Sequence, residues 1–385
     1  MMPASLSTPL ILRGHVQHYA WGGRHLIPSL LQQPGGDQPW AELWFGSHEQ
    51  GPTRVPGLQT TLRQLLAGQP LPYLLKVLEV AECLSIQVHP DRQQAIEGFA
   101  REEAAGIPRD AAERNYRDPN HKPEVMVALT HCHLLYGFSE PAHILARLAP
   151  YPSLASLAHL LRRTGLETLY RRVLQLSLAE RDTLLGPLLA QVIPAYEQDF
   201  WGQERHEFWL AKAAQQQGGR ECRDPGLLLM LLMELVEVAP GEAIFQPARL
   251  PHAYLHGCNL ELMANSDNVL RAGLTGKHVD SQSLLEIVDI AVRPPLRIQP
   301  LQLEAGCTSY PLPSAEFHLF HLHGQQPQWL PVHSGRGLLL NLGDAIRLSW
   351  PDGEIRCARG EALLIPPDCR CRLDGSGERN LYFAC

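Results

Sequence analysis

Four side chains that are distant along the chain are of the types that could share one divalent metal ion. Gln87 and His89 alternate along an apolar run, and a strand sends alternate side chains to the same face. Glu124 begins a second apolar run, and His252 opens a third. Two neutral imidazoles, one amide and one carboxylate would give a zinc site a net charge of about +1 and a position open to water or substrate. Enolisation requires such an electrophile.

The same residues also fit ordinary structural roles. Gln87 and His89 could form an inward polar pair held by hydrogen bonds. An isolated glutamate at the start of a strand, such as Glu124, is more often a surface charge. Spacing alone therefore leaves the metal site as one of two interpretations.

A polar segment from Glu261 to Asp280 gathers charged groups around small residues. Within it, Arg271 and Lys277 are cations of the kind that a sugar phosphate and a developing enediolate need. A solvated loop would tolerate the same groups. The segment is therefore a candidate for substrate binding, but its composition alone does not establish that role.

Six motifs also occur in order along the chain. They are Tyr19-Ala-Trp21-Gly22, Ala41-Glu42-Leu43-Trp44-Phe-Gly46-Ser-His48, Gln87-Val-His89-Pro90-Asp91, Asn115-Tyr116 to Glu124, Pro251-His252-Ala-Tyr254-Leu255 and Asn265-Ser-Asp267-Asn268-Val-Leu-Arg271-Ala-Gly273-Leu-Thr275. Together they resemble the type I mannose-6-phosphate isomerases, from Tyr19 to about Asp280 outside a helical insert. Gly276 departs from the family pattern, which commonly has proline before the lysine.

The resemblance implies a function and a set of roles. It implies reversible isomerisation of D-mannose 6-phosphate and D-fructose 6-phosphate through an enediol, feeding mannose metabolism and the supply of activated mannose (GDP-mannose). It also implies that Arg271 is the catalytic arginine and that one Zn²⁺ is bound per chain. The implied zinc ligands are Gln87, His89, Glu124 and His252.

The remaining site residues stay open at the level of sequence. Isomerisation needs a base within ~3 Å of the proton on the carbon next to the carbonyl. Lys122, His121 and Glu261 could each supply it, and the sequence does not choose among them. The candidates for contacts with substrate hydroxyl or phosphate groups are Ser85, Lys76, Lys277, Tyr254 and Asp267.

The elements that must hold these residues are mostly strands. The chain has 385 residues and 45% hydrophobic content, enough for two or three packed domains. Strands are expected at Tyr73–Val80, 84–88 and 252–255, and one helix at 93–105. Beyond 294, short strands at 317–322, 337–342, 345–350 and 362–365, with a hairpin turn at 351–353, are typical of a sandwich or jelly roll.

Leucines at helical spacing between about 142 and 217, with Ser177 and Glu180 spaced as a capping box, predict a helical insert. The resemblance implies cupin-type jelly-roll barrels, one catalytic and one C-terminal. We therefore expect a discontinuous catalytic domain (1–141 and 220–293), an α-helical insert (142–219) and a C-terminal jelly roll without metal (294–385). From Gly324 onward the last of these offers one histidine, His333.

Composition limits the partners. A net charge of −7 with dispersed basic residues provides no basic surface of the kind that binds nucleic acid. A small-molecule partner, here a sugar phosphate, is therefore the better interpretation. The most apolar stretch, 227–233, is too short to span a membrane, and no basic leader precedes the first apolar run. Nine scattered cysteines indicate reduced thiols and a cytoplasmic location. We expect a monomer.

Two other classes compete with the isomerase. Cupins with two histidines and a carboxylate also hold non-haem iron for oxygen chemistry, but here the partner of His89 is the neutral amide of Gln87. A non-catalytic sugar-binding barrel would explain the fold, but gives no reason to gather Arg271, Lys277 and four ligands.

Overall fold

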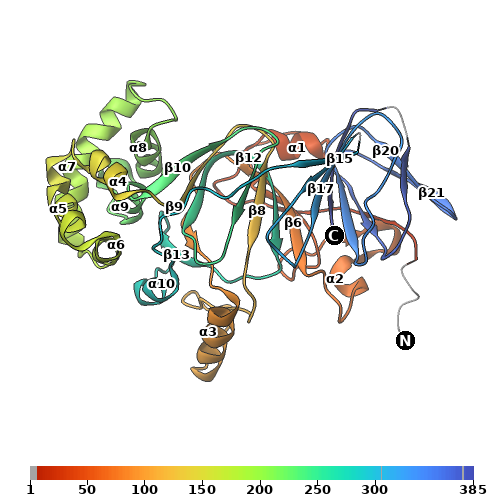
Figure 1. Ribbon diagram of the computed structural model, residues 1–385, viewed down its shortest axis with the longest axis horizontal. Coiled ribbons are helices and arrows are strands. Elements are labelled where there is room, and N and C mark those ends of the chain that lie inside the picture. Colours follow the sequence, from red (N-terminus) through yellow and green to blue (C-terminus); the bar gives the residue numbers. More distant parts are fainter. Residues whose placement is uncertain (1–6, 305, 375–376) are drawn as a thin grey trace.

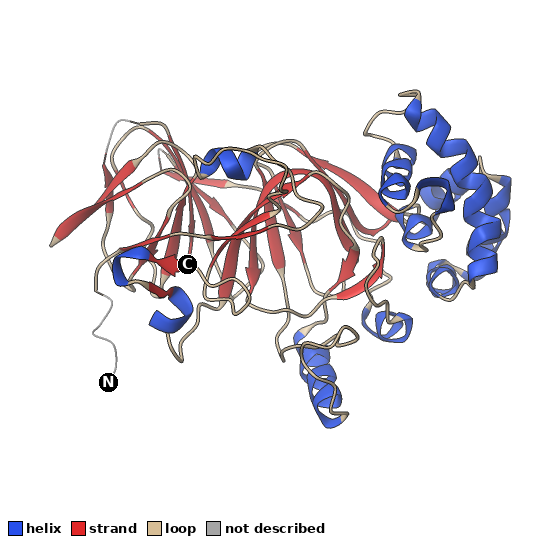
Figure 2. Ribbon diagram, turned by 180° about the vertical axis from the view of Figure 1, so that it is seen from behind, coloured by secondary structure: helices blue, strands red, loops and turns tan. Residues whose placement is uncertain are grey.

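The chain is mainly β, with many of its helices gathered at one end (Figures 1 and 2). The computed structural model describes residues 7–304, 306–374 and 377–385. Two large sheets lie side by side along the longest axis, and a group of helices lies beyond the first of them (Figure 1). The prediction of a mainly β protein with helices is therefore confirmed.

The first large sheet contains the strands that carry the candidate ligands. Its strands are β2 (His15–Gln17), β3 (Glu42–Phe45), β6 (Tyr73–Val80), β7 (Ile86–Val88), β8 (Glu124–Ala128), β9 (Cys132–Phe138), β10 (Met233–Val238), β11 (Ala243–Gln246), β12 (His252–Ala264), β13 (Leu270–Gly273) and β14 (Arg297–Ile298). The order is β14-β11-β8-β12-β6-β3-β2; β9 also pairs with β12 and holds β10, and β7 also pairs with β12 and holds β13.

The second large sheet is built mostly from the end of the chain. Its strands, in spatial order, are β1 (Leu10–Leu12), β22 (Ala362–Ile365), β19 (Gly337–Asn341), β24 (Arg379–Ala384), β17 (Leu319–Gly324), β16 (Cys307–Tyr310) and β15 (Leu301–Glu304). Two smaller sheets are formed by β18 (Gln328–Trp329), β23 (Arg372–Asp374), β20 (Ile346–Trp350) and β21 (Gly353–Cys357), and by β4 (Arg54–Val55) and β5 (Thr60–Thr61).

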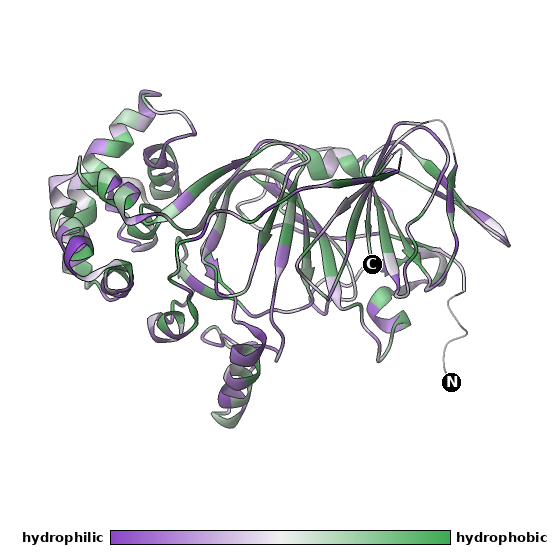
Figure 3. Ribbon diagram, in the orientation of Figure 1, coloured by the Kyte–Doolittle hydropathy of each residue, from purple (hydrophilic) through white to green (hydrophobic). Residues whose placement is uncertain are grey.

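The helices of the described residues lie mostly between β9 and β10 in the chain. They are α1 (Leu26–Leu30), α2 (Leu62–Leu65), α3 (Arg92–Ala104), α4 (Pro141–Leu148), α5 (Ala155–Thr164), α6 (Leu166–Leu174), α7 (Leu178–Glu197), α8 (His206–Gln216), α9 (Gly226–Met230) and α10 (Ser281–Ile287), with short 3₁₀ turns at Pro56–Leu58, Pro152–Leu154 and Gly219–Glu221. The capping box predicted from Ser177 and Glu180 is present at the start of α7. The largely polar α3 projects from the sheets and is coloured mainly as hydrophilic in Figure 3.

Strand β12 is longer than the sequence predicted. The expected strand ended at residue 255, but β12 continues to Ala264. Its first half pairs with β9 and β7, and its second half pairs with β6 and β8. A bulge near Gly257 separates the two halves; this residue has φ +108, and a Cβ there would lie 2.5 Å from the carbonyl oxygen of His131. The bulge lets one strand serve both parts of the sheet, so Glu261 lies on a strand and not in a loop.

Apolar side chains shared by the two large sheets hold them together. One buried cluster includes Val77, Val125 and Leu262 from the first sheet, and Leu340 and Leu364 from the second. Burying such side chains away from water is the main favourable term in folding. The second sheet is therefore packed directly against the scaffold of the candidate site.

The ends of the expected domains are interleaved. β1 pairs with β22 of the second large sheet, although 1–141 was assigned to the first domain. Conversely, β14 pairs with β11 of the first sheet, although 294–385 was assigned to the C-terminal one. The predicted domain boundaries stay a prediction. Within the part of the chain that the structure describes, none of the helices is both long enough and apolar enough for a membrane span.

Candidate active site

His89, Glu124 and His252 come together in the interior of the first sheet. Each is at most 4% exposed, and ligand atoms of the three lie within 4.8 Å of one another. The carboxylate oxygens of Glu124 lie 3.5 Å from His89 Nε2 and 3.1 Å from His252 Nε2. His89 follows β7, Glu124 begins β8 and His252 begins β12, so the ends of three strands supply the site.

Hydrogen bonds to backbone carbonyls orient both imidazoles. His89 Nδ1 lies 2.7 Å from the carbonyl oxygen of Asn268, and His252 Nδ1 lies 3.1 Å from that of Leu250. A carbonyl can only accept, so each Nδ1 carries the hydrogen and each Nε2 is left to face Glu124. His89 Nε2 is buried and has no hydrogen-bond partner. This is the orientation that metal-binding histidines require.

The charges of the group also suit a metal. Burial would raise the pKa of the Glu124 carboxyl, but Lys122 and His89 hold it well below its usual range. Burial, reinforced by Lys122, lowers the pKa of His89 well below its usual value. An anionic oxygen therefore faces the neutral His89, and a cation or proton must lie between the Glu124 oxygen and His252 Nε2, which are 3.1 Å apart. This is the donor set of a zinc site.

Gln87 lies on the same face as this group. It is paired directly with His252 on β12 and with Arg271 on β13. Directly opposite residues in antiparallel strands point to the same side of a sheet. Gln87 is partly buried, so its amide can reach the same interior from β7. Its role as a ligand stays a prediction.

A buried network of charges lies behind the metal-binding group. Lys76 Nζ lies 3.0 Å from Glu261 and 3.5 Å from Glu42, and all three side chains are at most 10% exposed. Burial opposes the charge of Lys76, but the two glutamates outweigh it and raise the lysine pKa. Tyr254 Oη lies 3.1 Å from Glu261 Oε1, and burial raises the pKa of the Glu261 carboxyl. Lys76, Tyr254 and Glu261 are thus linked in one buried network.

Lys122 contacts the metal-binding group through Glu124. Its Nζ is 2.9 Å from Glu124 Oε1, and its side chain is 9% exposed. Lys122 is one of the three candidate bases, and it contacts the candidate ligand Glu124 directly.

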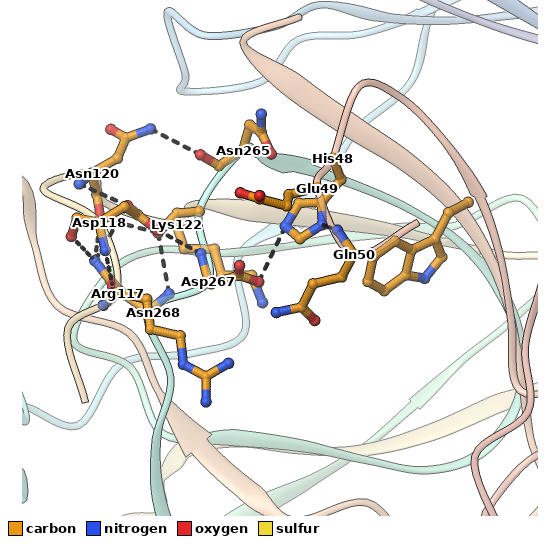
Figure 4. A network of polar contacts seen from close by, with 12 residues as sticks. His48, Glu49, Gln50, Arg117, Asp118, Asn120, Lys122, Asn265, Asp267 and Asn268 are labelled. Atoms are coloured by element: carbon orange, nitrogen blue, oxygen red, sulfur yellow. Dashed lines mark hydrogen bonds and ion pairs between the residues drawn. The ribbon is translucent and has the colours of Figure 1, made fainter. Parts of the chain in front are cut away.

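The loops that bear Lys122 and Asn268 are tied together by one network (Figure 4). The fully buried Asn268 accepts hydrogen bonds from the N–H groups of Arg117 and Asp118 and donates to the carbonyls of Asp118 and Asn120. The Asp118 carboxylate in turn accepts from Ser266 Oγ and from the Asp267 N–H. Because the Asn268 carbonyl also orients His89, this network couples the loop before Glu124 to a candidate ligand on another strand.

Asp267 is held by His48, a residue to which the sequence assigned no role. His48 Nε2 lies 3.1 Å from Asp267 Oδ1, and His48 Nδ1 accepts from the Gln50 N–H at 3.2 Å (Figure 4). Burial would raise the pKa of Asp267, but the hydrogen bond from His48 lowers it. The anionic Asp267, His48 and Asp118 line one cavity of about 560 Å³, a size that suits a small ligand.

Arg117, Arg271 and Lys277 are near enough for their charges to affect one another. Burial and the charge of Arg117 lower the pKa of Arg271, while burial, Arg271 and Arg117 lower that of Lys277. Within the described chain, none of the three has a carboxylate at ion-pair distance. Ser85, in the segment before β7, is partly buried. Unpaired neighbouring cations form a site for an anion.

Not every predicted site residue is in contact with the metal-binding group. His121 directs Nε2 toward Glu316, at 2.6 Å, in the segment between β16 and β17. The sequence assigned no role to Arg117, Asp118, Asn268 or Glu316. The first three lie in the recognised motifs, but their contacts depend on loops about 150 residues apart. Glu316 lies in no motif.

The fold and the donor set define the class of the protein: a mainly β protein with a buried site for a divalent metal. Residues 10–140 match the model of the phosphomannose isomerase type I catalytic domain. The mannose-6-phosphate isomerase of Escherichia coli K12 is 37% identical over 377 residues, covering 91% of this chain and 93% of that protein. The mannose-6-phosphate isomerase of Mus musculus is 32% identical over 320 residues, covering 72% of each.

Solved structures give the same result. The crystal structure of mannose 6-phosphate isomerase from Salmonella typhimurium bound to fructose 6-phosphate and zinc superposes with a TM-score of 0.86 at 32% identity, covering 98% of both chains. The chain belongs to the family of type I mannose-6-phosphate isomerases. These relatives do not favour the oxygenase or the sugar-binding barrel.

Proposed function

We propose that the chain interconverts mannose 6-phosphate and fructose 6-phosphate at the site around His89, Glu124 and His252. The observation that carries the proposal is the convergence of two Nε2 atoms and one ionised carboxylate in a buried place. The activity of the family, and the fructose 6-phosphate and zinc bound to the Salmonella typhimurium relative, support it.

His89, Glu124 and His252 would hold one zinc ion, with Gln87 as the fourth ligand. The unpartnered Nε2 of His89 and the acceptor-to-acceptor contact of His252 with Glu124 fit a cation at this place. When bound, zinc supplies positive charge that polarises a carbonyl oxygen and stabilises the oxyanion of an enediolate. Arg271, paired with Gln87 across the sheet, would add a second positive group at the same oxyanion.

The proton must move between C2 of the aldose and C1 of the ketose. Both oxygens of Glu261 already accept, one from Tyr254 and one from Lys76, and its side chain is 5% exposed. Glu261 is therefore the least suited of the three candidates to reach a substrate carbon. We assign the proton transfer to the turn that bears His121 and Lys122, with Glu261 and Lys76 as inner support.

The cations at the edge of the site would bind the phosphate. Arg117 and Lys277 have no carboxylate partner in the described chain, and their mutual repulsion with Arg271 would be relieved by a dianion. Ser85, beside β7, would add a hydroxyl contact, and Asp267 would accept from a sugar hydroxyl. Arg117 thus joins the residues proposed from the sequence.

We further propose the finer organisation expected from the sequence. The two large sheets would each belong to a cupin-type jelly roll, with the metal in the first, the helices of 142–219 as an insert, and no metal in the second. Among the described residues, the one group of histidine and carboxylate ligands is His89, Glu124 and His252, which supports this division. A monomer in the cytoplasm, without nucleic-acid partners, stays the expected state.

A coupled assay tests the function. The purified chain should convert mannose 6-phosphate to fructose 6-phosphate, lose activity after dialysis against a chelator, and regain it when one equivalent of zinc is added. Turnover that persists at undiminished rate in metal-free protein would contradict the zinc site. Absence of turnover in zinc-loaded protein that binds the sugar phosphate tightly would favour a binding protein.

A further inference from the structure

One carboxylate from the C-terminal part of the chain reaches the turn proposed to move the proton. Glu316 lies between β16 and β17, outside the first large sheet. Its neighbour Phe317 is 1% exposed and belongs to the cluster shared by the two large sheets, and the backbone of His318 makes two hydrogen bonds with Cys385, of 2.7 and 3.1 Å. Glu316 is therefore presented from a firmly packed segment.

The carboxylate of Glu316 makes three polar contacts with described residues. Its Oε1 lies 2.6 Å from His121 Nε2 and 2.6 Å from Arg92 Nη2, and its Oε2 accepts from Ser314 Oγ at 2.9 Å. The side chains of Glu316 and His121 are 17% and 21% exposed. Burial would raise the pKa of Glu316, but the hydrogen bonds from His121 and Ser314 lower it to about 2. The carboxylate is therefore ionised at neutral pH.

This ionised carboxylate determines which nitrogen of His121 carries the hydrogen. A carboxylate can only accept, so a contact of 2.6 Å requires the hydrogen to be on Nε2. Arg92 Nη2, 3.0 Å from the same nitrogen, then donates to Glu316 and not to His121. Nδ1 of a neutral His121 is left as the acceptor. Orientation of a histidine base by a carboxylate on its other nitrogen is a recurring device in proton transfer.

The same carboxylate touches both segments that lead to candidate metal ligands. Arg92 begins α3 three residues after His89, and His121 stands three residues before Glu124. These two segments meet at the same oxygen of Glu316, although they lie 224 and 195 residues away from it along the chain. A displacement of Glu316 would therefore shift the turn of His121 and Lys122 and the segment that follows β7.

We infer that Glu316 is a positioning residue for the isomerase reaction: it keeps His121 in the form with hydrogen on Nε2 and Nδ1 free, and it fixes the turn of His121 and Lys122 against the start of α3. The inference rests on the proposed function. By this inference the C-terminal region contributes to catalysis, although its described residues include no group of metal ligands.

The test compares Glu316→Gln and Glu316→Ala with the wild-type chain, all loaded with zinc. Glu316→Ala should lower kcat by about tenfold to a hundredfold, as loss of an outer-shell partner does, while KM changes by less than about threefold. Glu316→Gln keeps the size and one acceptor oxygen and should lie between the two. Glu354→Gln is the matched control, because Glu354 pairs with Arg347 at 3.4 Å on the exposed surface of the same region.

A double-mutant cycle separates positioning from general support. His121→Ala alone should lower kcat, and Glu316→Ala should lower it no further when His121 is already absent, since the carboxylate acts through the imidazole. Fully additive losses would overturn the inference. Wild-type kcat in Glu316→Ala would overturn it as well.

A measurement on the imidazole keeps the inference testable apart from activity. With ¹⁵N-labelled histidine, His121 of the wild-type chain should show hydrogen on Nε2, and Glu316→Gln should shift part of the population to Nδ1. Hydrogen on Nδ1 in the wild type would refute the role of Glu316 even if the enzyme is active. An inactive wild type with the expected Nε2–H form would instead count against the proposed function.

Discussion

The two large sheets have similar strand-built scaffolds but opposite interiors. The cluster between the second large sheet and its small neighbour consists of apolar side chains and cysteines, such as Leu348, Leu363 and Phe383. The interior of the first sheet carries Glu124 and Glu261 at comparable burial. Packing of strands therefore does not by itself make a site; the side chains at inward positions do.

The difference has an energetic cost. Buried charges lose hydration, and this loss is offset only where each charge meets a partner of good geometry. In the first sheet the partners are present: Lys76 between two glutamates, Lys122 on Glu124, and backbone carbonyls on both histidines. The second sheet buries Arg379, but none of its described residues is a buried carboxylate, so it bears less of that cost and can serve as support. Changes matched across the two regions should therefore affect different properties.

The largest contrast is expected for buried histidines. His252→Ala removes one Nε2 ligand, so zinc content should fall far below one per chain and turnover by orders of magnitude. His333→Ala removes a buried histidine of the C-terminal region whose ring nitrogens face backbone carbonyls at 3.2 Å. It should leave zinc content and kcat unchanged. Metal analysis and the coupled assay on both variants measure these effects. Loss of zinc from His333→Ala would contradict the expected difference between the two regions.

Arginines give the next contrast. Arg271→Ala should lower kcat by ~10²–10³, the usual loss for one group that stabilises an oxyanion, with zinc content still near one per chain. Arg347→Ala, at an arginine whose side chain is 62% exposed in the C-terminal region, should leave kcat unaltered. Retained activity in Arg271→Ala would refute its role.

Buried leucines should separate stability from activity. Leu348→Ala should cost about 3 kcal/mol of unfolding free energy through the cavity it leaves, with kcat unchanged. Leu134→Ala makes the same change on β9 beside Tyr254, and should lower both stability and kcat. Denaturant unfolding and steady-state kinetics measure the two effects. Equal loss of kcat in both variants would show that the second sheet is not merely support.

The smallest effect concerns pH. Burial, opposed by Asn380, lowers the pKa of His321 to about 4, below the ordinary 6.5. The unfolded chain then binds the extra proton first as the pH falls, so His321 contributes stability above pH 6.5 that is lost toward pH 4. Between pH 7 and 5 the loss should be about 1–2 kcal/mol. His321→Gln should flatten this dependence in metal-free protein; an unchanged slope would contradict the assignment.

Prediction from the sequence worked best where a few neighbouring residues determine the outcome. The strand Tyr73–Val80, the strand Ala362–Ile365 and the capping box at Ser177 are present as expected, and the expected helix at 93–105 is α3, one residue earlier. The sequence predicted only 252–255 of strand β12, because nothing local reveals that a bulge between Tyr254 and His256 lets the chain continue along β6. The expected strand at 317–322 begins two residues later because Phe317 packs in the core before β17.

For the site, residue types and ordered motifs named His89, Glu124 and His252 as ligands, and the structure brings them together. The role of Gln87 and the identity of the base stay predictions. The sequence missed Glu316 and the cluster of Arg117 with Arg271, because neither forms a pattern that can be read along the chain.

The sequence by itself determined which residues could bind a metal and which segments are strands or helices, since side-chain chemistry and local backbone preference depend on near neighbours. Only the tertiary structure decided which nitrogen of each histidine is free, which carboxylate is ionised, and that Glu316 meets His121 across 195 residues. The reason is that hydrogen bonds and charge interactions act over a few ångströms, so they are set by how distant segments pack.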